Sequence, residues 1–108
     1  MTTYHFDPQP KVKRIVDAKA IERVRVYAHG ICEYCGCACI VHVHHIKSKG
    51  SGGHDIEENL IALCTFCHDK AHKVRITKIV LLEIAEARAM EIRDRYGHMS
   101  MRELRKAG

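Results

Sequence analysis

The sequence predicts a small α+β domain, and three observations carry that prediction. Two Cys-x-x-Cys pairs, at residues 32–35 and 64–67, enclose a segment in which β-branched and other apolar residues gather into short runs. Apolar residues at helical spacing lie before the first pair and after the second pair. The chain has 108 residues, the length of one ordinary domain, so we expect a single domain over 1–108 with its core at 32–72.

The first half of the chain predicts a helix followed by a strand. The helix is expected over about residues 17–29, because Asp17 is a suitable N-cap and Gly30 is a suitable stop. The segment Cys37–His45 is rich in β-branched residues and alternates in character, which predicts a strand. The polar, glycine-rich residues that follow predict a loop.

The second half predicts a short strand and then two helices. Ile56–Leu63 is expected to form a strand or a turn followed by a strand, and the second cysteine pair is expected to open a helix. A long helix is expected over about residues 74–96, ending at Gly97. Its apolar residues form two stripes, and we expect the second stripe to be covered by a partner helix in a homodimer.

Four cysteines predict a structural zinc site. Thiolates are soft ligands that suit tetrahedral zinc, and four of them close its coordination shell. The alternative is a redox pair or free thiols, which two matched pairs make less favoured. The ligands are Cys32, Cys35, Cys64 and Cys67. We expect Cys37 and Cys39, two residues apart on the predicted strand, to be buried small apolar residues on one face.

The charge distribution favours a nucleic-acid partner, and the N-terminal sequence favours a location inside the cell. The formal net charge is +5, and the flanks 1–30 and 73–108 are basic while 31–72 is acidic. Basic flanks suit a polyanion such as DNA, although solubility alone also explains a mildly basic protein. The residues MTTYHFDPQP do not resemble a signal peptide, and no apolar run approaches membrane-spanning length, so we expect a cytoplasmic protein.

Histidines gather in two clusters that the cysteine pairs should bring together. His44 and His45 end the first predicted strand, and adjacent strand residues point to opposite faces. His68 and His72 lie four residues apart, on one face of the predicted helix. The spacing suits a division of labour in which one strand histidine binds a metal ion with His68 and the other takes a proton.

The motifs CEYCG, VHHIKSKGSGGHDIEENLIALC and TFCHDKAH resemble the HNH endonuclease family, which has the ββα-metal fold. The resemblance covers about residues 32–72. It implies that His44 and His68 bind a catalytic divalent ion, with Mg²⁺, Mn²⁺, Ni²⁺ and Zn²⁺ as candidates, and that His72 is a further ligand of this ion or a phosphate contact. It also implies that His45 is the general base and that Asn59 orients the loop and that base. A chain of this size most resembles phage or prophage members.

The function that follows is hydrolysis of DNA phosphodiester bonds, by nicking, by double-strand cleavage or by both. Lys47, Lys49 and Lys70 flank the site and are possible phosphate contacts, or simply solvated charges. The alternative is a zinc-stapled DNA-binding module without catalysis, which the cysteine pairs and basic flanks alone would fit. A degenerate nuclease fold that binds other proteins is a third possibility, and the intact motif argues against it.

Overall fold

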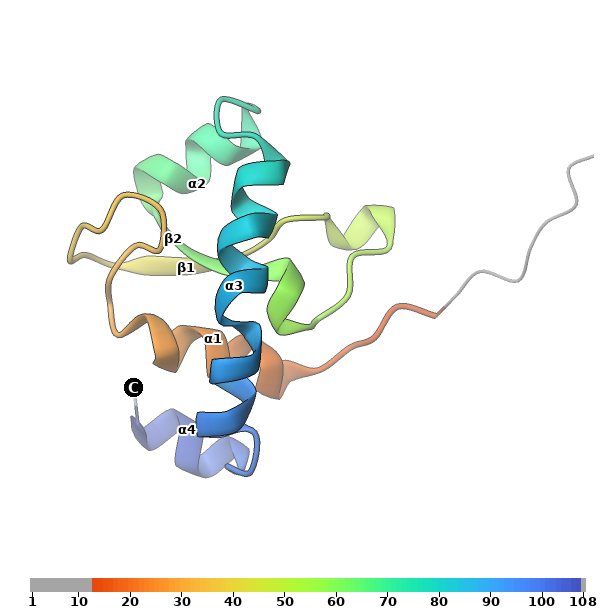
Figure 1. Ribbon diagram of the computed structural model, residues 1–108, viewed down its shortest axis with the longest axis vertical. Helices are drawn as coiled ribbons and strands as arrows, with labels where there is room; N and C mark the ends of the chain where they lie inside the picture. The colour runs from red at the N-terminus through yellow and green to blue at the C-terminus, as the bar shows by residue number, and fades with distance from the viewer. Residues whose placement is uncertain (1–12, 108) are drawn as a thin grey trace, which may run out of the picture.

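The computed structural model describes residues 13–107 as an α+β domain with one small sheet (Figure 1). Along the chain, the two strands and the two short 3-10 turns follow the first helix and precede the last three helices. This confirms the predicted fold class, including an N-terminal helix and a long C-terminal helix. The elements are α1 (Ala18–Ala28), β1 (Val41–His45), η1 (Lys49–Ser51), η2 (Glu57–Asn59), β2 (Leu60–Cys64), α2 (Thr65–His72), α3 (Lys78–Tyr96) and α4 (Met101–Ala107).

The sheet is an antiparallel hairpin of β1 and β2, with His44 opposite Ile61 and His45 opposite Leu60. All five residues of β2 are buried, whereas β1 is mostly half-buried. The reason is that β2 contributes to two apolar clusters: Ile61 and Leu63 pack with the cysteine sites and α3, and Leu60 and Ala62 pack against α1. A strand covered on both faces reads as a continuous apolar run, as the sequence LIALC does.

The long helix α3 packs against β2 and α1 (Figure 1). Its buried residues lie on one face and include Arg88, which is 6% exposed. Arg88 donates two hydrogen bonds to the Glu33 carboxylate, at 2.8 and 2.9 Å, and others to the carbonyl oxygens of Glu57, Leu60 and Ala85. Because Glu33 lies between Cys32 and Cys35, this one side chain ties α3 to the first cysteine pair.

Two predicted boundaries differ from the structure. The strand begins at Val41 and not at Cys37, because residues 33–35 form a turn and Ala38 makes only an isolated bridge to Ile31. The prediction that Cys37 and Cys39 are buried on a strand is therefore wrong: both are exposed in the segment between this turn and β1, and the structure pairs their sulfur atoms as a disulfide.

The long helix begins at Lys78, four residues later than expected. Val74 adopts a left-handed conformation that ends α2, and Thr77 caps α3 by accepting a hydrogen bond from the Val80 amide. Of the apolar residues on α3, Ile79, Val80, Ala87 and Met90 are exposed, and the rest are buried or half-buried within the chain. Among the described residues, no helix is long and apolar enough to cross a membrane. The segment MTTYHFDPQP lies outside the described residues.

Candidate metal sites and catalytic centre

The sulfur atoms of Cys32, Cys35, Cys64 and Cys67 all lie within 4.8 Å of one another. Cys35 and Cys64 are 3.8 Å apart, and four sulfurs placed tetrahedrally at zinc–sulfur bond length would be separated by about 3.8 Å. The amides of Cys35 and Cys67 donate to the sulfurs of Cys32 and Cys64, so each two-residue gap forms a tight knuckle. The cluster can hold a metal ion, and its donor set fits a closed tetrahedral site.

The electrostatics of this cluster favour at least one thiolate. Burial alone would raise the pKa of Cys32, but hydrogen bonds from backbone amides, that of Cys35 foremost, outweigh burial and lower the pKa to about 6. A thiol that gives up its proton near neutral pH is ready to bind a cation.

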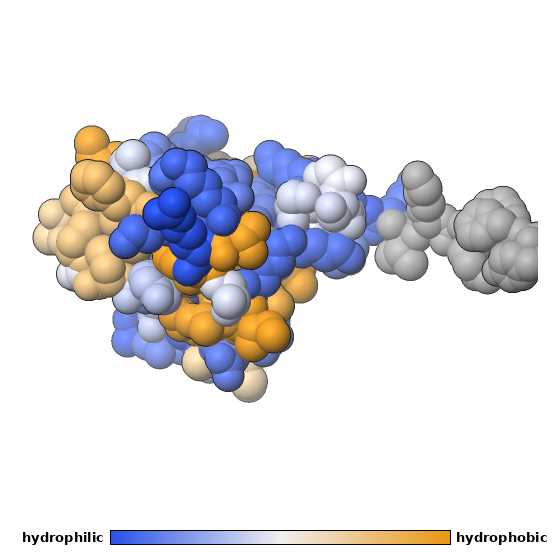
Figure 2. Space-filling model, turned by 90° about the horizontal axis from the view of Figure 1, so that it is seen from above, coloured by the Kyte–Doolittle hydropathy of each residue, from blue (hydrophilic) through white to orange (hydrophobic). Residues whose placement is uncertain are grey.

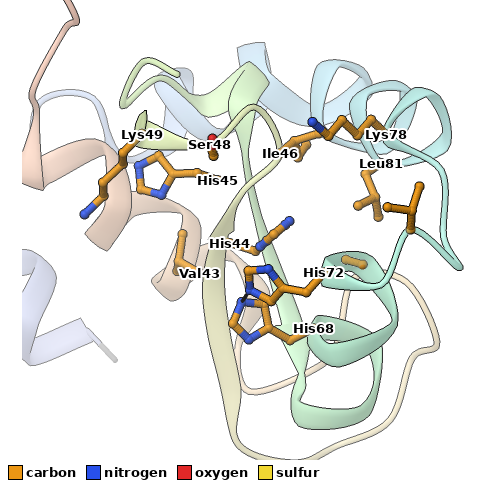
Figure 3. A pocket seen from close by; sticks show the side chains of 12 residues that line it. Val43, His44, His45, Ile46, Ser48, Lys49, His68, His72, Lys78 and Leu81 are labelled. Atoms are coloured by element: carbon orange, nitrogen blue, oxygen red, sulfur yellow. Dashed lines mark hydrogen bonds between the residues drawn. The ribbon is translucent and has the colours of Figure 1, made fainter. Parts of the chain in front are cut away.

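A second cluster consists of three histidines from two elements, the end of β1 and one face of α2. Ligand nitrogens of His44, His68 and His72 all lie within 4.8 Å of one another, and the Nε2 atoms of His68 and His72 are 3.1 Å apart. The three rings converge on one point in Figure 3. His42 lies on the same face of β1 and stacks beside His68, but it is not part of this three-residue cluster.

Two of the three histidines in this cluster have lowered pKa values, which favours the neutral imidazole. Burial, and next the positive charge that His68 and His72 would carry, lower the pKa of His44 to about 4. Burial likewise lowers the pKa of His68. Neutral imidazoles are the form that binds metal ions, and three of them leave positions open for water or substrate.

His45 points to the opposite face of β1 and meets a buried carboxylate. Its Nε2 lies 2.7 Å from Oδ1 of Asp55, which is 3% exposed. Burial alone would raise the pKa of Asp55, but hydrogen bonds from His45, the Asp17 amide and Arg14 outweigh burial and lower the pKa to about 2. Asp55 is thus ionised at neutral pH and can only accept, so the Nε2 atom of His45 donates to it.

Asn59 is buried and fastens the loop between the strands. Its Oδ1 accepts from the amide of Lys47 at 2.7 Å, and its Nδ2 donates to the carbonyl oxygens of Lys47 and His54. These bonds hold both ends of the glycine-rich loop together. Asn59 therefore positions the residues just after His45 without touching the His45 side chain itself.

A cavity of about 410 Å³ joins the two faces of this centre. It is lined by His44, His45, His68 and His72, by Lys49 from the loop, and by Lys78 and Leu81 from α3 (Figure 3). Of the other two lysines singled out from the sequence, Lys47 lines a neighbouring depression and Lys70 lines neither cavity.

Sequence reasoning missed Asp55 and Lys78. Asp55 was detectable in principle as the carboxylate at the end of the glycine loop, but its contact with His45 spans ten residues and depends on how the loop folds back. Lys78 carries no local signal, since it reaches the cavity only because the chain between α2 and α3 places the first residue of α3 beside the histidines.

The hairpin, the following helix and the two ligand clusters define a ββα-metal domain fastened by a four-cysteine site. Residues 32–74 match the model of the HNH endonuclease family, so this segment is an HNH endonuclease domain. A relative from Escherichia coli (strain K12), the type IV methyl-directed restriction enzyme EcoKMcrA, is 38% identical over 52 residues. That alignment covers 40% of this chain and 19% of the relative, so the chain spans only a small part of that protein.

Proposed function

We propose that this chain is a metal-dependent endonuclease that hydrolyses DNA phosphodiester bonds, with His45 as the general base. The observation that carries the proposal is the arrangement on β1: His45 meets an ionised carboxylate on one face, and three imidazoles converge on the other. A protein that only bound DNA would need neither feature. The match of residues 32–74 to the HNH family supports the same reaction.

In this mechanism Asp55 accepts a hydrogen bond from the Nε2–H of His45, which fixes the tautomer and leaves the lone pair on Nδ1. Nδ1 then removes a proton from the water that attacks the scissile phosphorus. Asn59 keeps the loop folded so that His45 holds its orientation. Lys78 and Lys49 line the cavity and can contact the phosphate oxygens.

His44, His68 and His72 would hold the catalytic divalent ion, and Mg²⁺, Mn²⁺, Ni²⁺ and Zn²⁺ are the candidates. When bound, such an ion stabilises negative charge on the phosphate and the leaving oxygen. An all-imidazole set is softer than a carboxylate set and favours transition metals. The four-cysteine cluster would hold a structural zinc ion.

The relative's name describes methyl-directed restriction, but the alignment covers only 19% of that protein, so we carry over the hydrolysis and not the recognition of methylated DNA. A cytoplasmic location fits a DNA substrate. A homodimer through residues 74–96 stays a prediction. A monomer with a single centre would mainly nick duplex DNA, whereas a dimer could cut both strands.

The test is a supercoiled-plasmid assay across divalent metals, with wild type beside His45→Ala. Loss of the general base should lower the cleavage rate by about 10²–10⁴-fold, while the fold and DNA binding persist. His98→Ala, which removes an exposed imidazole distant from the centre in sequence, is the matched control and should cleave like wild type. If His45→Ala nicks at the wild-type rate, the base assignment is wrong. If no metal supports cleavage by wild type, the non-catalytic binding module is favoured.

A further inference from the structure

A second depression, of about 870 Å³, opens beside the cavity of the catalytic centre. Four cationic residues line it: Lys13 and Arg14 from the segment before α1, and Lys47 and Lys49 from the glycine-rich loop. The remaining lining residues are Gly50, Ser51, Gly52 and His54, so no carboxylate from residues 13–107 lines it. In Figure 2 the side from which the N-terminal segment leaves the molecule is mostly hydrophilic.

The wall of this depression is fixed by hydrogen bonds between segments about 40 residues apart. Arg14 donates to Asp55 at 2.8 Å and to the carbonyl oxygen of Gly53. The Ile15 amide donates to Nδ1 of His54, and the Asp55 amide donates to the Ile15 carbonyl oxygen. Asp55 is thus shared: it orients His45 and also holds the segment that carries Lys13 against the loop.

The lysines around the depression are uncommitted. Within residues 13–107, neither Lys13, Lys47 nor Lys49 forms an ion pair, and all three are exposed. The loop amides, in contrast, are used: those of Ser51, Gly52 and Gly53 donate to carbonyl oxygens within the loop. An anion here would therefore be held by ammonium groups and not by backbone amides. Such contacts attract phosphates but do not recognise the base sequence.

The depression is also continuous with the centre. Lys49 lines both cavities, and in Figure 3 it lies beside His45, on the side of β1 away from the three metal-binding candidates. If the reacting phosphate of a polyanion lies at His45, the neighbouring phosphates on this side of β1 would lie first near Lys49 and then near Lys13 and Lys47.

We propose that this depression is a second phosphate-binding site, which holds the DNA strand next to the scissile phosphate through Lys13 and Lys47. The inference rests on the proposed nuclease function and adds the direction in which the bound strand leaves the centre. The binding is electrostatic and independent of base sequence, so it should release counterions and depend steeply on salt.

The test measures affinity for a labelled DNA duplex, by fluorescence anisotropy, in a His45→Ala background and without chelators. The double variant Lys13→Gln/Lys47→Gln should reduce the slope of log affinity against log salt by about 1.8, since each phosphate contact contributes about 0.9. Lys13→Arg/Lys47→Arg should restore the slope, because it restores the charge. The matched control is Arg102→Gln/Lys106→Gln on α4, which removes the same charge outside both cavities and should leave the slope unchanged.

An unchanged slope in Lys13→Gln/Lys47→Gln, or an equal loss in the α4 control, overturns the second site. Either result leaves the nuclease proposal intact, since that depends on cleavage lost in His45→Ala. Failure of the His45→Ala protein to bind DNA at about 50 mM salt, where phosphate contacts are strongest, would overturn both.

Discussion

Val74 is a strained residue at the rim of the catalytic cavity. It has a φ of 57°, in the left-handed region that β-branched residues rarely adopt. Its amide donates to the Ala71 carbonyl oxygen at 3.1 Å, and the Arg75 amide donates to that of Lys70 at 2.8 Å. These two bonds form a Schellman motif that ends α2, with valine in the position that glycine normally occupies.

Val74→Gly should therefore stabilise the protein. The left-handed conformation costs a non-glycine residue about 1–2 kcal/mol, which glycine avoids. The greater conformational entropy of glycine in the unfolded chain offsets about 0.5–1 kcal/mol of this stabilisation. The Val74 side chain is 70% exposed, so little packing is lost. Urea unfolding would measure a net gain of about 0.5–1 kcal/mol.

Val80→Gly is the matched control for this change. Val80 lies in the first turn of α3, in ordinary helical conformation, so glycine there should destabilise by about 1 kcal/mol. If both variants lose stability equally, Val74 is not strained.

At the scale of elements, α3 is held to the cysteine knuckle by the five hydrogen-bonding donors of one buried guanidinium. Arg88 and Glu33 lie 55 residues apart in sequence, and Glu33 also exchanges hydrogen bonds with the backbone of Ala62 on β2. The bonds satisfy a carboxylate and three carbonyl oxygens together. Removing one partner leaves the others buried and unpaired, which costs more than the pair itself contributes.

Arg88→Met should destabilise the protein by about 3–5 kcal/mol. Arg95→Met, on the exposed side of the same helix, breaks only a surface ion pair with Glu91 and should cost less than about 1 kcal/mol. Both can be measured by urea unfolding with zinc present. Arg88→Lys keeps the charge but not the planar fork, and should retain part of the stability if Arg88→Met does not fold. Equal losses in Arg88→Met and Arg95→Met would contradict this role.

At the scale of the whole molecule, two small apolar clusters share one strand, and the four-cysteine site lies at the edge of one of them. A core this small supplies little net stability, so a metal ion bound by the four cysteines would be part of the folding free energy. Because the thiols must lose their protons to bind it, this contribution falls as the pH is lowered.

Cys64→Ser should abolish cooperative folding, and removal of zinc from the wild type by a chelator should have the same effect until zinc is restored. Circular dichroism and zinc content would report both. Cys39→Ser is the matched control, because Cys39 is exposed and lies outside the four-cysteine cluster. It removes the bond between Cys37 and Cys39 but should stay folded with its zinc. A folded Cys64→Ser protein without zinc would refute a structural role for the site.

The sequence by itself determined the features that depend on short spacing. The two Cys-x-x-Cys pairs, the opposite faces of His44 and His45, and the shared face of His68 and His72 all follow from the geometry of a turn, a strand and a helix. The α+β class and its order of elements followed from the same local patterns.

Only the tertiary structure decided which distant residues meet. The contacts of Asp55 with Arg14 and His45 and of Arg88 with Glu33, and the position of Lys13 in the same depression as the loop, depend on chain reversals that no local pattern encodes. The same holds for the late start of β1, because residues 37–40, which follow the knuckle turn, find no strand partner beyond the isolated bridge between Ala38 and Ile31. Propensity is a local preference, whereas burial and ion pairing are set by everything that packs around a residue.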